Sequence, residues 1–136
     1  MNLLTYNALL FANDLILPVS MDRMAIIGAR QTLAGVREIR ELWPERRLDV
    51  LAVLPVAVST TVATRAAFDA FDADPELSEP LYRPGIRQCI DVTYALTQQQ
   101  TIWEYAPRSR GAEDYGAFIR HLAGRRGRPA AQPAAS

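Results

Sequence analysis

The stretch LDVLAVLP, residues 48–55, is a near-continuous apolar run that indicates the fold class. An apolar run of this length without alternation is typical of a strand covered on both faces, as in a parallel sheet. Pro55 cannot donate to a sheet ladder, so we expect the strand to end there. The run LILPV, residues 15–19, follows the turn signal Asn13-Asp14 and predicts a second buried strand.

Helical patterns flank these two strands. Over residues 20–44 apolar side chains recur at helical spacing, with Ser20 or Asp22 as N-cap and Pro44 as the stop. Further helices are predicted over residues 3–12, 62–74, 91–99 and 111–123, and Gly124 is expected just after the last of them.

Residues 75–91 hold three prolines and one glycine, which predicts a loop with one short strand near Leu81-Tyr82 or Ile86. Pro75 is expected to close the helix before it. TIWEY, residues 101–105, predicts a last strand, ended by Pro107. Because helices alternate with short apolar strands, we predict an α/β fold with a partial parallel sheet and helices on both faces.

The composition fits one globular domain of 136 residues, with 49% apolar and 22% charged side chains. We expect an α/β segment at residues 1–124 and a disordered tail rich in Arg, Pro and Ala at residues 125–136. The formal net charge is zero, so no overall basic field draws the chain to nucleic acid.

The usual catalytic motifs are missing from the 136 residues. All 15 basic residues are Arg, so no lysine can serve in a phosphate loop or a Schiff base. The sequence contains no G-x-x-x-x-G-K-[ST], no G-x-S-x-G and no His-Glu-x-x-His. The single Cys89 excludes an intrachain disulfide, and we expect the single His121 to be a solvated helix-end residue. We therefore predict no catalytic residue and no resident metal.

Three aspartates, Asp69, Asp72 and Asp74, are close in sequence at the end of a predicted helix. They allow a hard-cation site, although a solvated acidic face is the favoured interpretation. The N-terminus lacks the features of a signal peptide, and no apolar run approaches the ~20 residues that span a membrane. We expect a cytoplasmic protein without membrane contact.

Four stretches together resemble the C-terminal half of the ParA/Soj/MinD-type (deviant Walker) partition ATPases. They lie at residues 2–33, 48–55, 86–95 and 101–123, and the last, TIWEYAPRSRGAEDYGAFIRHLA, is the most specific. The resemblance implies the C-terminal half of a P-loop NTPase-like fold and a role in plasmid or chromosome partitioning and DNA segregation. In that family ATP and Mg²⁺ are the cofactors.

The resemblance also implies site residues. One wall of a nucleotide-base pocket would be formed by Pro55, Val56, Ile86, Arg87 and Cys89. A simpler interpretation is that Pro55 and Ile86 only end strands. Contacts to the DNA backbone would come from Arg87, Arg108 and Arg110. The alternative for these arginines is a solvated basic turn.

Some positions depart from the family pattern. Ser59 and Thr61 stand where the family often has an Asp and then an Arg, and Asp91 stands where a basic residue is usual. Losing two cations weakens phosphate contact, so we expect only weakened nonspecific DNA binding. The family's lysine loop and Mg²⁺-binding aspartates would precede Met1. Phosphoryl transfer depends on such groups, so we expect no ATP hydrolysis and no cofactor for this chain alone.

Three functional hypotheses follow from these features. The first is a partition protein without its phosphate-loop half, explained by a split gene, a late start codon or a decayed copy. The second is a non-enzymatic interaction module that docks on a full-length ParA-like partner. The third is a free-standing α/β domain of another activity. In the first two, the strand at residues 15–19 would have an unpaired edge, which predicts self-association or a ParA-like partner.

Overall fold

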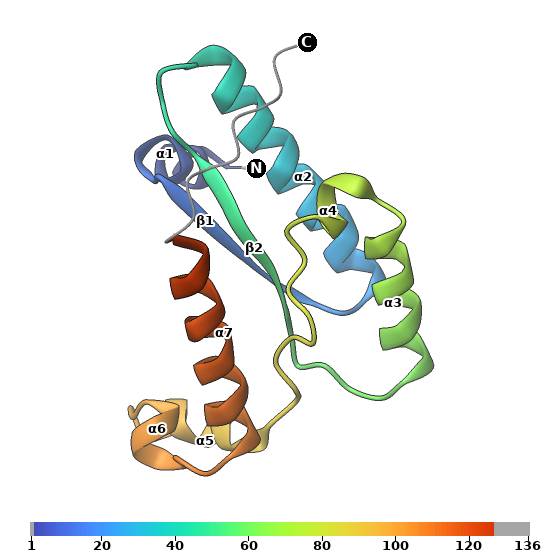
Figure 1. Ribbon diagram of the computed structural model, residues 1–136, viewed down its shortest axis with the longest axis vertical. Coiled ribbons are helices and arrows are strands. Elements are labelled where there is room, and N and C mark those ends of the chain that lie inside the picture. The colour runs from blue at the N-terminus through green and yellow to red at the C-terminus, as the bar shows by residue number, and fades with distance from the viewer. Residues whose placement is uncertain (1, 127–136) are drawn as a thin grey trace.

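The computed structural model describes residues 2–126 of the chain, and it confirms the predicted α/β fold (Figure 1). In chain order the elements are α1 (Leu3–Phe11), β1 (Asp14–Ser20), α2 (Arg23–Leu42), β2 (Asp49–Val56), α3 (Val62–Asp72), α4 (Pro75–Ser78), α5 (Ile90–Thr97), α6 (Ile102–Tyr105) and α7 (Arg110–Arg126).

The strands β1 and β2 form a two-stranded parallel sheet. Their register runs from the pair Asp14 and Asp49 to the pair Ser20 and Val56. The register shifts once, because Leu51 is an extra residue on β2. Its carbonyl oxygen accepts a hydrogen bond of 2.7 Å from Arg125 Nη1. A side chain at the end of α7 therefore provides a donor for the backbone carbonyl of the extra residue.

Helices cover both faces of β2, as the apolar run predicted. Val53 is buried in a core cluster with the apolar sides of α2 and α3. Ala52 and Leu54 point to the opposite face of the sheet. They pack with Tyr82 and Ile86, which precede α5, and with Phe118 of α7. Figure 1 shows α7 on one side of the two strands and α2 and α3 on the other. None of the helices described within residues 2–126 is long and apolar enough to cross a membrane.

An extended segment at residues 80–88 runs beside β2, where the sequence predicted a short strand. Parallel bridges join Val53 to Leu81 and Val58 to Arg87. The predicted end of β2 at Pro55 is one residue short, because the strand continues to Val56. Proline lacks only the donor, and the Pro55 carbonyl still accepts from the Ile86 amide at 2.8 Å.

The predicted strand at residues 101–105 is wrong, because this stretch forms the short helix α6. Thr101 and Glu104 form a capping box: the Thr101 hydroxyl accepts from the Glu104 amide, and the Glu104 carboxylate accepts from the Thr101 amide. These reciprocal bonds satisfy amides that a helix start leaves without partners. Local capping therefore outweighs the strand preference of Ile102, Trp103 and Tyr105.

Two helix boundaries also differ from the prediction. Pro75 begins α4 rather than only closing α3, with Asp74 as the N-cap, because a proline fits the first turn of a helix. α7 continues through Gly124 to Arg126, past the predicted boundary of the tail. The rest of the predicted disordered tail lies outside the described residues.

Gly85 allows residues 80–88 to approach β2 closely. Its φ is +84°, and an added Cβ would lie 2.8 Å from the Pro55 carbonyl oxygen. We expect Gly85→Ala to lower the free energy of unfolding by about 1–3 kcal/mol. Gly28, in α2, has no atom within 4 Å of such a Cβ, so Gly28→Ala should instead raise it by about 0.5–1 kcal/mol. Urea unfolding of both variants measures this contrast, and midpoint shifts of the same sign would contradict it.

Candidate functional site

The predicted base-wall residues lie along the seam between β2 and residues 80–88. Pro55 and Ile86 are neighbours there, and both are buried. Val56 is partly buried and packs against the same cluster. Ile86 therefore contributes to the core that joins the sheet to α7, and Pro55 is a fully buried residue of the adjacent strand. A role for this set in binding a nucleotide base stays a prediction.

Arg87 links residues 80–88 to α7 through hydrogen bonds to Asp114. The carboxylate of Asp114 accepts from the Arg87 amide, Nε and Nη2, each at 2.9 Å. Glu113 adds a longer ion pair of 3.3 Å to Nη2. The guanidinium hydrogen bond lowers the pKa of Asp114, against a raising effect of partial burial. The same bond raises the pKa of Arg87. The Arg87 side chain is about half exposed, but its guanidinium already has an anionic partner.

A small open pocket of about 250 Å³ lies between the N-terminal ends of α5 and α7. It is lined by Gln88, Cys89, Ile90, Thr93 and Arg110. The structure thus brings Cys89, a predicted wall residue, beside Arg110, a predicted phosphate contact. Cys89 is a free, half-buried thiol whose sulfur lies 3.8 Å from Asp91 Oδ2.

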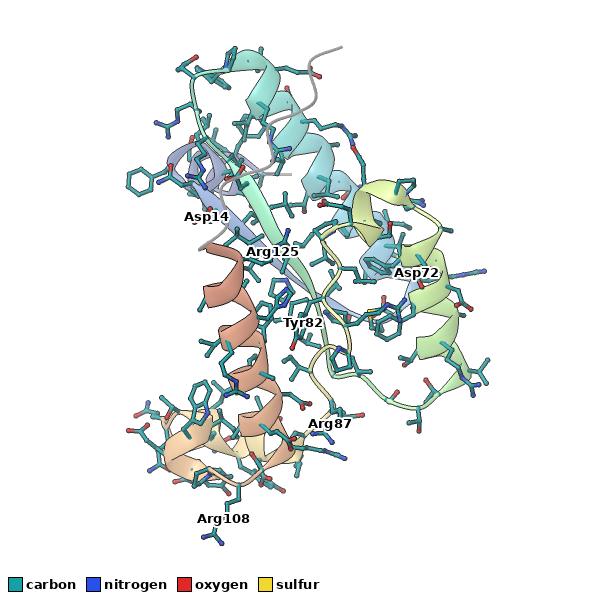
Figure 2. All side chains as sticks on the ribbon, viewed as in Figure 1. Asp14, Asp72, Tyr82, Arg87, Arg108 and Arg125 are labelled. Carbon is teal, nitrogen blue, oxygen red and sulfur yellow. The ribbon has the colours of Figure 1, made fainter. Side chains whose placement is uncertain are left out.

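Arg108 lies in the turn between α6 and α7, at the end of the molecule distant from α1. Figure 2 shows its side chain pointing away from the body of the protein. Arg110 follows at the start of α7 and is also exposed. These two arginines are freer to meet a phosphate than Arg87 is. DNA contact by the three residues stays a prediction.

The acidic residues at the end of α3 have separate partners. Asp72 pairs with Arg83, and Asp74 pairs with Arg30 at 2.9 Å while capping α4. Within the described part of the chain no three His, Cys, Asp or Glu side chains are grouped to hold a metal. His121 is exposed, and its ring centroid lies 4.9 Å from that of Tyr82.

The link between Arg87 and Asp114 was missed in the sequence. In the sequence, Asp114 is marked only by its place in the first turn of the last helix, where the helix dipole favours an acid. Its partner lies 27 positions earlier, and no local pattern marks that pairing. The capping box of α6 was visible as Thr-x-x-Glu at residues 101–104 and would have corrected that element.

Comparisons with known proteins identify relatives. No family model matches the chain. Cell division protein PomZ of Myxococcus xanthus (strain DK1622) is 29% identical over 121 residues, which are 88% of this chain and 37% of PomZ.

Two solved structures share the fold. Cobyrinic acid a,c-diamide synthase from Mycobacterium smegmatis, solved with bound ADP and magnesium, has a TM-score of 0.63 at 24% identity, over 97% of this chain and 48% of that chain. A Cyanothece McdA variant in complex with ATP has a TM-score of 0.67 at 17% identity, over 91% of this chain and 47% of that chain.

These matches confirm the predicted relationship: the chain is related to the ParA/MinD-type partition ATPases and has an α/β fold like that of P-loop NTPases. It spans less than half the length of each relative.

Proposed function

We propose that this chain is the part of a ParA-like partition protein that lacks the phosphate loop, and that it acts in the cytoplasm in plasmid or chromosome partitioning. The match to PomZ across 88% of the chain carries the proposal. The shared fold of the two solved structures supports it, because both superpose over nearly the whole chain.

These 136 residues are expected not to hydrolyse ATP by themselves. The sequence has no lysine and therefore cannot supply the phosphate-loop lysine that holds the β- and γ-phosphates. The residues of the predicted base wall would add little without that anchor, because the loop amides supply most donors to the phosphates. In a mixture of the purified chain, ATP and Mg²⁺, we expect no phosphate release above background. Steady turnover would contradict this.

Deletion of the gene in its host tests the partitioning role itself. We expect the fraction of daughter cells without the plasmid or chromosome copy to rise, and the wild-type gene to restore segregation. The Phe71→Ala variant, which is expected to lose about 3–5 kcal/mol of stability, should restore segregation less well than the wild-type gene does. Unchanged segregation in the deletion strain would contradict the proposal.

A second candidate function is a non-enzymatic module that docks on a full-length ParA-like protein. It is favoured by the apolar side chains that the described chain leaves bare on α1. The module would change the ATP turnover of its partner. Titrating the chain into a full-length ParA-like ATPase distinguishes the candidates, because only the module is expected to change the ATP turnover of a complete enzyme.

A further inference from the structure

The acidic first turn of α7 lies among the arginines at the end of the molecule that holds α5 and α6. Glu113 and Asp114 both contact the guanidinium of Arg87. Asp114 is also close enough to Arg110 for that positive charge to help lower the pKa of Asp114. Within residues 2–126, neither Arg110 nor the outward-pointing Arg108 forms an ion pair (Figure 2). Arg87 is therefore the arginine of this group that the chain itself neutralises.

Asp114 occupies one edge of the Arg87 guanidinium. Its carboxylate accepts from Nε and Nη2 at 2.9 Å each, and it also accepts from the Arg87 amide. The Asp114 side chain is 11% exposed, whereas that of Arg87 is 48% exposed. Arginine binds phosphate groups through the same kind of paired contact from one edge of the guanidinium. Asp114 therefore takes the edge of Arg87 that a phosphate would use.

The charges around this guanidinium disfavour a second anion. The positive charge of Arg87 faces two negative charges, on Glu113 and Asp114, so the three side chains together carry a net charge of −1. A phosphate that approaches the remaining nitrogen, Nη1, meets this net negative charge. Displacing Asp114 instead breaks two charge-assisted hydrogen bonds and leaves a poorly exposed carboxylate without the guanidinium. Arg87 can therefore contribute little to phosphate binding while Asp114 is in place.

We propose that Asp114 makes an autoinhibitory contact, which keeps Arg87 from binding the phosphate backbone of double-stranded DNA. Without the carboxylate, Arg87 gains a free edge close to Arg110, which lines the same pocket as the neighbouring Gln88. Both partners of the contact lie within residues 87–114, so the competition involves no other part of the chain. Only the choice of DNA as the source of the phosphate rests on the proposed function.

Salt-dependent DNA binding by the full 136-residue chain tests this contact. A labelled random-sequence duplex is titrated with wild type and with Asp114→Asn at salt concentrations between about 50 and 200 mM. Each additional phosphate contact steepens the slope of log K against log salt by about 0.9. We expect this steepening for Asp114→Asn, with a dissociation constant on the order of tenfold lower at about 50 mM salt.

Three further variants assign the gain to Arg87. Glu113→Gln removes a charge from the same guanidinium but leaves Asp114 on its paired edge, so the slope should not change. Adding Arg87→Ala to Asp114→Asn should return the slope to the wild-type value. Arg87→Ala alone should also leave the slope unchanged, and it keeps the test decisive if Asp114→Asn fails to fold. Circular dichroism at the assay temperature checks the fold of each variant.

The outcomes separate the autoinhibitory contact from the function. A steeper slope for Asp114→Asn that Arg87→Ala abolishes supports the contact. Equal slopes for Asp114→Asn and Glu113→Gln, a gain that survives Arg87→Ala, or no binding by any variant overturns it. A wild-type slope that Arg87→Ala alone reduces by about 0.9 also overturns it, because Arg87 would then already contact phosphate. Normal segregation in the deletion strain, together with the expected slopes, leaves the contact standing and counts against the partitioning role.

Discussion

Replacing Phe71 by alanine is expected to lower the free energy of unfolding by about 3–5 kcal/mol. Phe71 lies in α3 with 0% of its surface exposed and is the largest fully buried side chain. It packs in the cluster that holds α3 against α2 and Val53 of β2. The substitution removes the transfer free energy of the ring and leaves a cavity that close-packed neighbours fill only in part.

The loss is large relative to the stability of such a domain. The free energy of unfolding of a domain of this size is about 5–15 kcal/mol. A two-stranded sheet depends strongly on the helices that cover it for its stability. Phe11→Ala is the matched control, because Phe11 is 86% exposed on α1 and its removal should change the stability by less than about 0.5 kcal/mol. Urea unfolding followed by circular dichroism measures both variants. A loss below about 1.5 kcal/mol for Phe71→Ala would show that the core re-forms around the gap.

Most of the core was predictable because its signals are local and periodic. The run at residues 48–55 predicted a strand buried on both faces, and Val53 and Leu54 do pack on opposite sides. The apolar spacing in residues 20–44 predicted α2, with Asp22 as its observed N-cap. In both cases the side-chain period and the buried face come from consecutive residues, so no tertiary contact was needed to infer them.

The wrong and the missed predictions concern segments whose structure is determined by distant or competing contacts. At residues 101–105 β-branched and aromatic side chains favoured a strand, but a four-residue capping motif selected a helix. The candidate site depends on contacts between residues 87–89 and the first turn of α7, more than twenty positions apart. The sequence suggested Arg87 as a phosphate contact, but it could not reveal that Asp114 already occupies the guanidinium.

Replacing Asp114 by asparagine is expected to lower the free energy of unfolding by about 1–3 kcal/mol at pH 7. The Asp114 side chain is 11% exposed and accepts three hydrogen bonds from Arg87, two of them from the guanidinium. Asparagine keeps the shape and one acceptor oxygen but loses the charge and the bidentate pairing. The effect is smaller than for a fully buried pair, because Arg87 is about half exposed to water.

Neighbouring Glu113 provides the matched control. Its side chain is 76% exposed and contacts the same guanidinium at 3.3 Å. An exposed ion pair of this kind contributes little, so Glu113→Gln should change the stability by less than about 0.5 kcal/mol. Equal losses in the two variants would mean that any negative charge near Arg87, rather than the hydrogen-bonded carboxylate of Asp114, provides the stabilisation.

The pH dependence of the Asp114→Asn effect gives an independent check. The pKa of Asp114 is lowered in the folded chain by Arg87, whereas an unfolded aspartate has a pKa of about 3.9. Its stabilisation is therefore complete above the unfolded pKa and is lost as the pH falls through the lower, folded pKa. The difference in unfolding free energy between wild type and Asp114→Asn should be constant near neutrality and shrink in that acidic range. Asp22, Asp74 and Glu104 also have lowered pKa values, so their protonation in acid destabilises both proteins alike. Their effect therefore cancels in the difference, which reports on Asp114. A difference that persists unchanged below the folded pKa would show that the amide substitution acts through packing instead of charge.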